Sequence, residues 1–351
     1  MPRARPRRIP CDCFDCRTFE VSNLQQKTIP AWKASALQEP PPKCLVFLLP
    51  GEAMQEAHKP PPPVPHLNNL AAEGCSGLLA LRKLSASLEG KTQGCNQVLA
   101  HFLEVHEPAA DQTQQSLAER YKGLAAGIAS SDADILSVAE KAAVTRVPSI
   151  CDSKSMSECQ LPDAATATDN ILTVFGLKRC LAAKAAALNT LPSALFESVA
   201  DADEGEDDDD LDMLVLDPSS AADGAEALAW ADAVVGHLCG NVDVKDSILM
   251  VLLMPVDKPL CSPCVVNGAE LPPGMRRPKQ SYEYLGVEEV QSQRDSCVVM
   301  AQRLKGVVRC DNVKAFTYEE CSKWGAAGGI LVERLLPELA FKLGRASKYG
   351  A

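Results

Sequence analysis

The chain has 351 residues, of which 46% are hydrophobic and 23% charged, so it can bury a large core and is not disordered throughout. Nine acids between Asp201 and Asp212 carry most of its net charge of −11, and the remainder is nearly neutral. No basic field is left for a nucleic acid, and no stretch reaches the roughly 20 apolar residues that cross a bilayer. We therefore expect neither a nucleic-acid partner nor a membrane partner.

The fifteen cysteines are odd in number and spread along most of the chain, with no apolar signal-peptide core before them. This pattern favours reduced thiols and a cytoplasmic location. Four arginines within the first eight residues leave an organelle transit segment as the alternative. We predict that residues 1–40 form a disordered, basic, cysteine-containing tail. Residues 41–351 are expected to form one α/β domain with an acidic loop insertion at about 201–212.

The first predicted strand is Lys43–Leu49, which is continuously apolar and suits the interior of a parallel sheet. Pro50 and Gly51 end it. Residues 68–81 then predict a helix, a turn and a second strand, with Asn68 as the N-cap and Gly74 ending the helix in a left-handed conformation.

The next segments are less regular. We predict helices over Asn96–Val105, Gln114–Ala129 and Lys178–Leu188, and a short strand over Asp169–Phe175. The acidic run at 201–212 repels itself and lacks apolar spacing, so it is expected to be a solvated loop.

The clearest unit is a strand, helix and strand at 213–217, 223–240 and 248–254. Order resumes at 296–306 and 318–322, and a last helix is predicted over about 330–343, kinked or divided at Pro337. Alternating strands and helices predict an α/β fold, with a mainly parallel central sheet and helices on both faces.

Two of these stretches resemble a known family. Residues 65–79 read P-H-L-N-N-L-A-A-E-G-C-S-G-L-L, and residues 227–236 match an A-x-x-W-x-D-x-x-V-G helix before a strand. Both are similar to segments of the alkaline phosphatase superfamily, and of the cofactor-independent phosphoglycerate mutases within it. The resemblance implies an alkaline-phosphatase-like sheet. It also implies two metal ions, usually zinc, manganese or magnesium, held by Asp and His at the carboxyl ends of the strands, with a serine or threonine nucleophile between them.

The strand ends depart from that pattern. Where the family has Asp-Gly after the first strand, this chain has Pro50-Gly51. The carboxylates available near the three strand ends are Glu52, Asp217, Asp223 and Asp257, and no histidine lies among them. Because paired cations need several anionic or imidazole ligands, we expect a degenerate site. The sequence thus predicts a non-catalytic pseudoenzyme without a cofactor, acting through binding to an unknown protein partner or through assembly.

The alternative hypothesis is a metal-dependent phosphate-ester hydrolase or phosphotransferase with rearranged ligands. Its catalytic candidates are Glu52, Asp217, Asp223 and Asp257, with zinc, manganese or magnesium as the cofactor.

Other motifs favour ordinary structural roles. Cys261 and Cys264 form a C-x-x-C that could join Cys11, Cys13 and Cys16 as zinc thiolates, but the clusters lie far apart in sequence and incidental thiols are favoured. His101 and His106 are poorly spaced to share a metal, and His237 is expected to pack or lie on the surface. We expect Trp230 and Trp324 in the core and the glycines of 325–329 at a close backbone approach.

Overall fold

The computed structural model describes residues 42–51, 62–82, 94–105, 115–147, 161–181, 210–218, 224–242, 244–260 and 292–347, and four two-residue strands between 265 and 289. The chain divides into two compact units, one comprising Met1–Pro40 and Arg179–Asp201 and the other comprising Pro41–Lys178 and Ala202–Ala351. The second unit contains every strand in the described ranges. The predicted tail at 1–40 and most of the acidic run lie outside the described residues.

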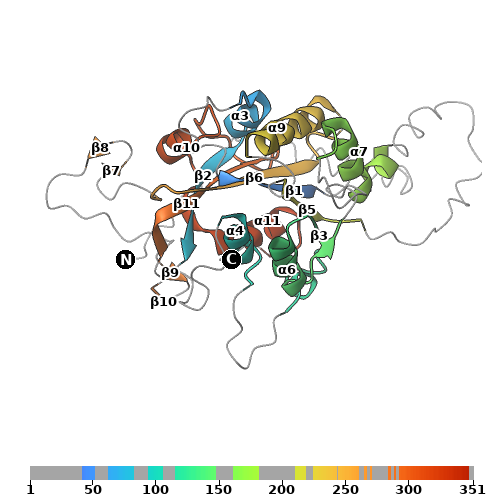
Figure 1. Ribbon diagram of the computed structural model, residues 1–351, viewed down its shortest axis with the longest axis horizontal. Helices are drawn as coiled ribbons and strands as arrows, with labels where there is room; N and C mark the ends of the chain where they lie inside the picture. The colour runs from blue at the N-terminus through green and yellow to red at the C-terminus, as the bar shows by residue number, and fades with distance from the viewer. Residues whose placement is uncertain are drawn as a thin grey trace, which may run out of the picture. The chain divides into compact units, whose positions relative to one another are not determined.

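An eight-stranded sheet forms the centre of the second unit, in the order β12-β2-β11-β6-β1-β5-β3-β4 (Figure 1). Every neighbouring pair is parallel except those made by β11, which runs antiparallel to β2 and β6. The prediction of a mainly parallel α/β fold is therefore confirmed. The strands are β1 Lys43–Leu48, β2 Cys75–Arg82, β3 Ala126–Ala129, β4 Thr145–Arg146, β5 Met213–Leu216, β6 Ile248–Val256, β11 Ser292–Arg303 and β12 Gly328–Leu331.

Two small hairpins stand apart from this sheet. One pairs β7 (Val265–Val266) with β8 (Ala269–Glu270), and the other pairs β9 (Tyr284–Leu285) with β10 (Glu288–Glu289).

Helices cover both faces of the sheet (Figure 1). One face carries α3 (Pro65–Ala72), α7 (Ala164–Val174), α9 (Gly224–Gly240) and α10 (Tyr318–Trp324). The other carries α4 (Cys95–Phe102), α6 (Ala133–Lys141) and α11 (Leu335–Lys342), and the short α5 (Leu117–Arg120) precedes β3. Because both faces are covered, β1, β5 and nearly all of β6 are buried along their whole length, as continuous apolar runs predict. Within the described segments, no helix is both long and apolar enough to cross a membrane.

Two predicted elements are wrong in type. Asp169–Phe175 is not a strand but the second half of α7, whose N-cap Asp163 accepts a hydrogen bond from the Thr166 amide. Its buried residues 167, 168, 171 and 172 follow a helical spacing that becomes visible only when the segment is read from Asp163. The predicted helix Gln114–Ala129 instead divides into α5 and β3. The chain turns between them at Lys122 and Gly123, which both have positive φ.

The predicted ends of α3 are also wrong. The helix starts at Pro65, and Asn68 accepts a hydrogen bond from the Phe316 amide instead of capping it. Gly74 is not left-handed; a side chain there would place its Cβ 2.3 Å from the Gln302 carbonyl oxygen, so the glycine permits close approach of β11.

At the C-terminal end, the predicted helix 330–343 is preceded by strand β12 and a 3₁₀ turn at Val332–Arg334. Pro337 lies in the first turn of α11, where its missing N–H costs no helical hydrogen bond. Trp230 is buried as expected, whereas Trp324 is 47% exposed and that prediction is wrong. The close approach expected at 325–329 occurs at Gly325, whose Cβ would lie 2.6 Å from the Ser76 carbonyl oxygen.

Candidate functional site

The carboxyl ends of β6, β1 and β5 meet at one edge of the sheet. The register pairs Phe47 with Leu216 and Leu48 with Leu253, so β1 and β5 end at nearly the same level, while β6 continues three residues further to Val256. The Leu49 amide extends this alignment by donating a 2.8 Å hydrogen bond to the Leu253 carbonyl. Ligands in open α/β sheets bind outside this edge, and it is the place where the family resemblance puts its metals.

Asp217 follows β5 and is the described candidate that lies closest to this edge. Its side chain is fully buried, and its Oδ2 accepts a 2.6 Å hydrogen bond from the Ser130 hydroxyl. Ser130 follows β3 and also accepts a hydrogen bond from the amide of Asp132, the N-cap of α6. The Asp217 backbone amide donates to the Ala129 carbonyl at 2.9 Å. The carboxylate therefore joins the ends of two neighbouring strands.

The ends of β1 and β6 pack tightly against each other. A Cβ on Gly51 would lie 2.1 Å from the carbonyl oxygen of Pro255, closer than real Cβ contacts allow. Gly51 is thus needed so that the backbone after β1 can rest on β6. Backbone atoms occupy the space next to Gly51 in which a side chain would otherwise project.

Asp257 lies beyond the end of β6 and is exposed. The register puts Asp217 level with Leu253, and Asp257 follows Leu253 by four residues, which is about 13 Å along the strand direction. The two carboxylates also follow different strands, β5 and β6, which are separated by β1. The next residue, Lys258, forms a 2.5 Å ion pair with Glu319 and lies over the Tyr318 ring, which holds this segment against α10. The structure therefore does not bring Asp217 and Asp257 together, and Glu52 and Asp223 lie outside the described residues.

A buried polar cluster lies below the end of β2. Glu333 accepts hydrogen bonds from Arg82 at 2.8 Å and contacts His101 Nδ1 at 3.1 Å, and His101 is only 1% exposed. Burial alone would raise the pKa of Glu333, but the hydrogen bond and charge of His101, with the charge of Arg82, lower it below its ordinary value. The cluster joins α4 to the turn before α11, which is a structural role.

The remaining described histidines are His66 on α3 and His237 on α9. His237 is exposed, as expected, and His66 is exposed as well, while His58 and His106 lie outside the described residues. The C-x-x-C pair Cys261 and Cys264 also lies outside them. In the part of the chain that the structure describes, no three His, Cys, Asp or Glu side chains form a group that could hold a metal ion.

Sequence reasoning missed two of the residues that shape this edge. Ser130 was detectable as part of S-S-D before the helix at 133–141, a typical helix start, but its contact with a carboxylate 87 residues away was not. Cys95 also reaches the edge, since its thiol lies 3.6 Å from the Leu49 carbonyl oxygen.

Comparison with known proteins finds no matching family and no matching curated protein. Among solved structures, the chain is similar to the PH0037 protein from Pyrococcus horikoshii, at 11% identity over 89% of this chain and 100% of that one, with a TM-score of 0.49. It is similar to a protein in the alkaline phosphatase superfamily from Vibrio parahaemolyticus, at 9% identity over 89% and 69% of the two chains, with a TM-score of 0.41. A third match, at 9% identity over 88% and 100% and a TM-score of 0.33, is the alkaline phosphatase from the Antarctic bacterium TAB5. Two of these proteins carry the name of the superfamily that the sequence resembles, and likeness at this level concerns the fold alone.

Proposed function

We propose that this chain is a non-catalytic protein with an alkaline-phosphatase-like fold, which acts through protein binding or assembly. The observation that carries the proposal is the close packing of the strand ends at the carboxyl edge. Gly51 rests on the Pro255 carbonyl, and Asp217 is buried in a 2.6 Å hydrogen bond with Ser130. The first contact fills the space beside Gly51 with backbone, and the second engages one oxygen of the described carboxylate that lies closest to this edge.

The physical argument concerns ligands. Two cations a few ångströms apart must replace most of their hydration shell with carboxylate or imidazole groups. Asp217 is fully buried and its Oδ2 accepts the Ser130 hydroxyl, so it supplies at most one carboxylate where a metal pair needs several ligands. Asp257, the other described candidate, lies too far along the sheet to share the same metal pair.

Support for a binding role comes from Trp324 at the end of α10. Trp324 is 47% exposed, and the Lys323 ammonium lies 4.9 Å from the centroid of its ring. Tryptophan is the residue type most enriched at the energetic centres of protein interfaces. The adjacent Gly325 packs on Ser76 near the start of β2, which places the end of α10 at the amino edge of the sheet.

Metal content and turnover test the proposal directly. Purified protein is dialysed against zinc, manganese or magnesium, freed of unbound ion, and assayed by elemental analysis and by hydrolysis of an aryl phosphate. We expect no stoichiometric metal and no turnover above that of the metal in buffer. The proposal is refuted if two ions bind per chain, are lost in Asp217→Ala and are kept in the control Asp246→Ala. Turnover that is lost in Asp217→Ala and kept in Asp246→Ala would refute it as well.

Assembly is tested separately by sedimentation velocity over a range of protein concentrations. A shift to higher mass that Trp324→Ala abolishes would support assembly through this face. A monomer at every concentration would exclude self-assembly and restrict the proposal to binding a different protein, which crosslinking in cells would then have to detect.

A further inference from the structure

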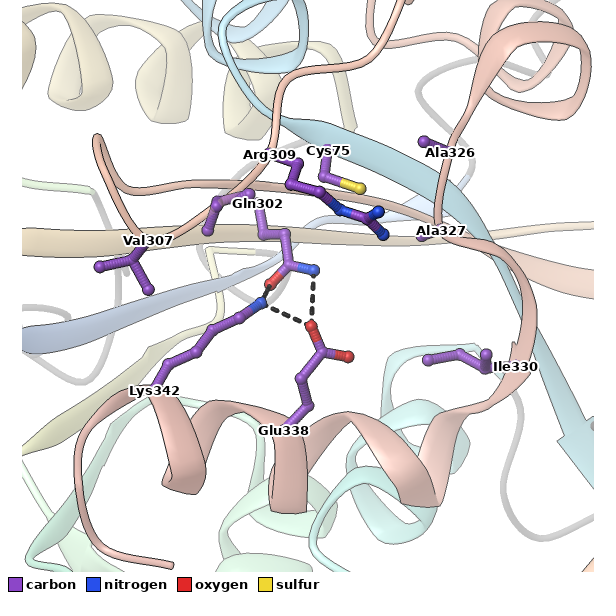
Figure 2. Close-up of a pocket in the computed structure, with 10 residues that line it drawn as sticks. Cys75, Gln302, Val307, Arg309, Ala326, Ala327, Ile330, Glu338 and Lys342 are labelled. Atoms are coloured by element: carbon purple, nitrogen blue, oxygen red, sulfur yellow. Dashed lines mark hydrogen bonds and ion pairs between the residues drawn. The ribbon is translucent and has the colours of Figure 1, made fainter. Parts of the chain in front are cut away.

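A pocket of about 260 Å³ lies at the amino edge of the sheet, opposite the edge discussed above. It is bounded by the start of β2 at Cys75, the end of β11 at Gln302, the loop that follows β11, and α11 (Figure 2). Its walls are mixed in character. Val307, Val308, Ile330 and two alanines supply apolar surface, while Gln302, Arg309, Glu338 and Lys342 supply polar groups.

Three of the polar side chains form a closed triangle. The Lys342 ammonium donates to Gln302 Oε1 at 2.6 Å and to Glu338 Oε1 at 2.5 Å, and Gln302 Nε2 donates to the same Glu338 oxygen at 3.1 Å. Gln302 is buried, and only a small part of the Lys342 side chain is exposed. Because each member is held by the other two, the triangle is a rigid polar floor rather than a set of mobile surface chains.

Two polar side chains in or beside this triangle can form further hydrogen bonds with a ligand. The second carboxylate oxygen of Glu338 accepts no hydrogen bond from the described residues, and in Figure 2 it points away from the triangle toward Ile330. Arg309 makes no hydrogen bond or ion pair with any side chain in the described ranges, and its guanidinium extends over the pocket beside Cys75 (Figure 2). The pocket thus offers one planar cationic donor and one anionic acceptor, facing an apolar wall.

We propose that this pocket binds a small hydroxy monocarboxylate with an apolar side chain. Arg309 and Lys342 are positively charged and Glu338 is negatively charged, so the pocket carries a net charge of +1. One carboxylate on the ligand would neutralise it. The Arg309 fork matches the two oxygens of a carboxylate, and the free oxygen of Glu338 is satisfied by a ligand hydroxyl.

The volume and the charges restrict the ligand further. A cavity of 260 Å³ is slightly smaller than the roughly 300–1,000 Å³ of pockets for drug-sized molecules, so the ligand is small. A doubly charged phosphate would place its second charge against Glu338, which disfavours it relative to a monocarboxylate. The inference does not depend on the proposed non-catalytic role, because the pocket lies at the other edge of the sheet.

Mandelate is the probe that tests the proposal, because it carries a carboxylate, an α-hydroxyl and an apolar ring. Phenylacetate, which lacks only the hydroxyl, and inorganic phosphate serve as comparison ligands. The measurements are calorimetric titration and amide chemical shifts at Ala326 and Ala327. We expect mandelate to bind with a Kd of about 1 mM or below, more tightly than either comparison ligand, and to shift both amides.

Variants identify the groups responsible. Arg309→Gln should weaken mandelate binding at least about tenfold, the effect of losing a charged hydrogen-bond partner. The control Lys305→Gln removes an exposed cation from the same loop, paired with Asp246 outside the pocket, and should leave Kd unchanged. Glu338→Gln should reduce the preference for mandelate over phenylacetate and improve phosphate binding.

Several results would overturn the proposal. The proposal is wrong if no mandelate binding is detected at a mandelate concentration about ten times the expected Kd. It is also wrong if Arg309→Gln binds mandelate as tightly as the unaltered protein. Phosphate binding as tightly as mandelate to the unaltered protein would contradict the ligand class, and equal affinity for phenylacetate would contradict the role of Glu338.

Discussion

Asp232 of α9 caps a helix other than its own, and its removal should destabilise the protein more than the loss of an ordinary cap. Helix α3 begins after Val64, which has no capping side chain. The Asp232 Oδ1 instead accepts the amides of His66 and Leu67 at 2.8 and 2.9 Å, and Asp232 is only 6% exposed. The first amides of a helix lack helical acceptors and carry partial positive charge, so a buried carboxylate at this end is stabilising.

The magnitude follows from two buried bonds to a charged acceptor. Asp232→Ala leaves both amides without a partner, and hydrogen bonds to charged groups contribute about 1.5–3 kcal/mol each. The two share one oxygen, so their losses do not add fully, and alanine in a helix interior returns about 0.5 kcal/mol of propensity. We expect a net loss of about 3 kcal/mol. Asp232→Asn keeps a neutral acceptor and should lose about 1 kcal/mol.

Urea unfolding at neutral pH measures these losses, with Asp132→Ala as the matched control. Asp132 caps its own helix α6 through the amides of Asp134 and Ile135, at 2.8 and 3.3 Å, but it is partly exposed to water. Its replacement should cost about 1 kcal/mol, as a typical N-cap does. Equal losses in the two alanine variants would refute the argument that burial and charge strengthen the α9 cap.

Three further predictions concern packing, pH and thiol reactivity. Gly51→Ala should destabilise the protein by about 1–3 kcal/mol in urea unfolding, because its Cβ meets the Pro255 carbonyl; an unchanged midpoint would show that the strand ends are looser than described. Folding lowers the pKa of Glu333, so the ionised carboxylate stabilises the protein at pH values above its ordinary pKa of 4.5, and this stabilisation is lost as the pH falls through the lower pKa of the folded state. Glu333→Gln should therefore flatten the decline in unfolding free energy at acid pH. A decline in the variant parallel to that of the unaltered protein would contradict this. Burial raises the pKa of the Cys321 thiol to about 12, whereas Cys310 is exposed, so alkylation followed by mass spectrometry should label Cys310 first; early labelling of Cys321 would contradict this.

The main strands could be predicted because their signal is local. The continuous apolar runs that became β1 and β6 are the pattern of strands buried on both faces, and each was located to within two residues at each end. The second half of helix α7, from Asp169, resembles a strand because this apolar stretch is short and the N-cap Asp163 lies six residues before it. A period of two and a period of 3.6 are difficult to separate over so few residues.

The contacts that shape the candidate site could not be predicted, because they join distant segments. Ser130 and Asp217 are 87 residues apart, and the fit of Gly51 against Pro255 depends on strand register, which sequence patterns alone did not reveal. The sequence did predict that 50–51, 217 and 255 lie at the ends of apolar strands, although β6 continues through Pro255 to Val256. The order of these strands in the sheet was not predicted. The sequence could not indicate that the groups at these positions would bond to one another.

The residues that carry the family resemblance explain why the fold is easier to predict than the activity. In the W-x-D segment of α9, the Trp230 indole donates a 2.7 Å hydrogen bond to the Pro162 carbonyl before α7, and Asp232 caps α3. These two side chains of the motif thus join three helices on one face of the sheet. A chain can keep these helix-to-helix bonds whatever groups follow β1, β5 and β6. Resemblance in α9 is therefore a statement about the layer that covers the sheet, and any argument about chemistry has to come from Gly51, Asp217 and Pro255 themselves.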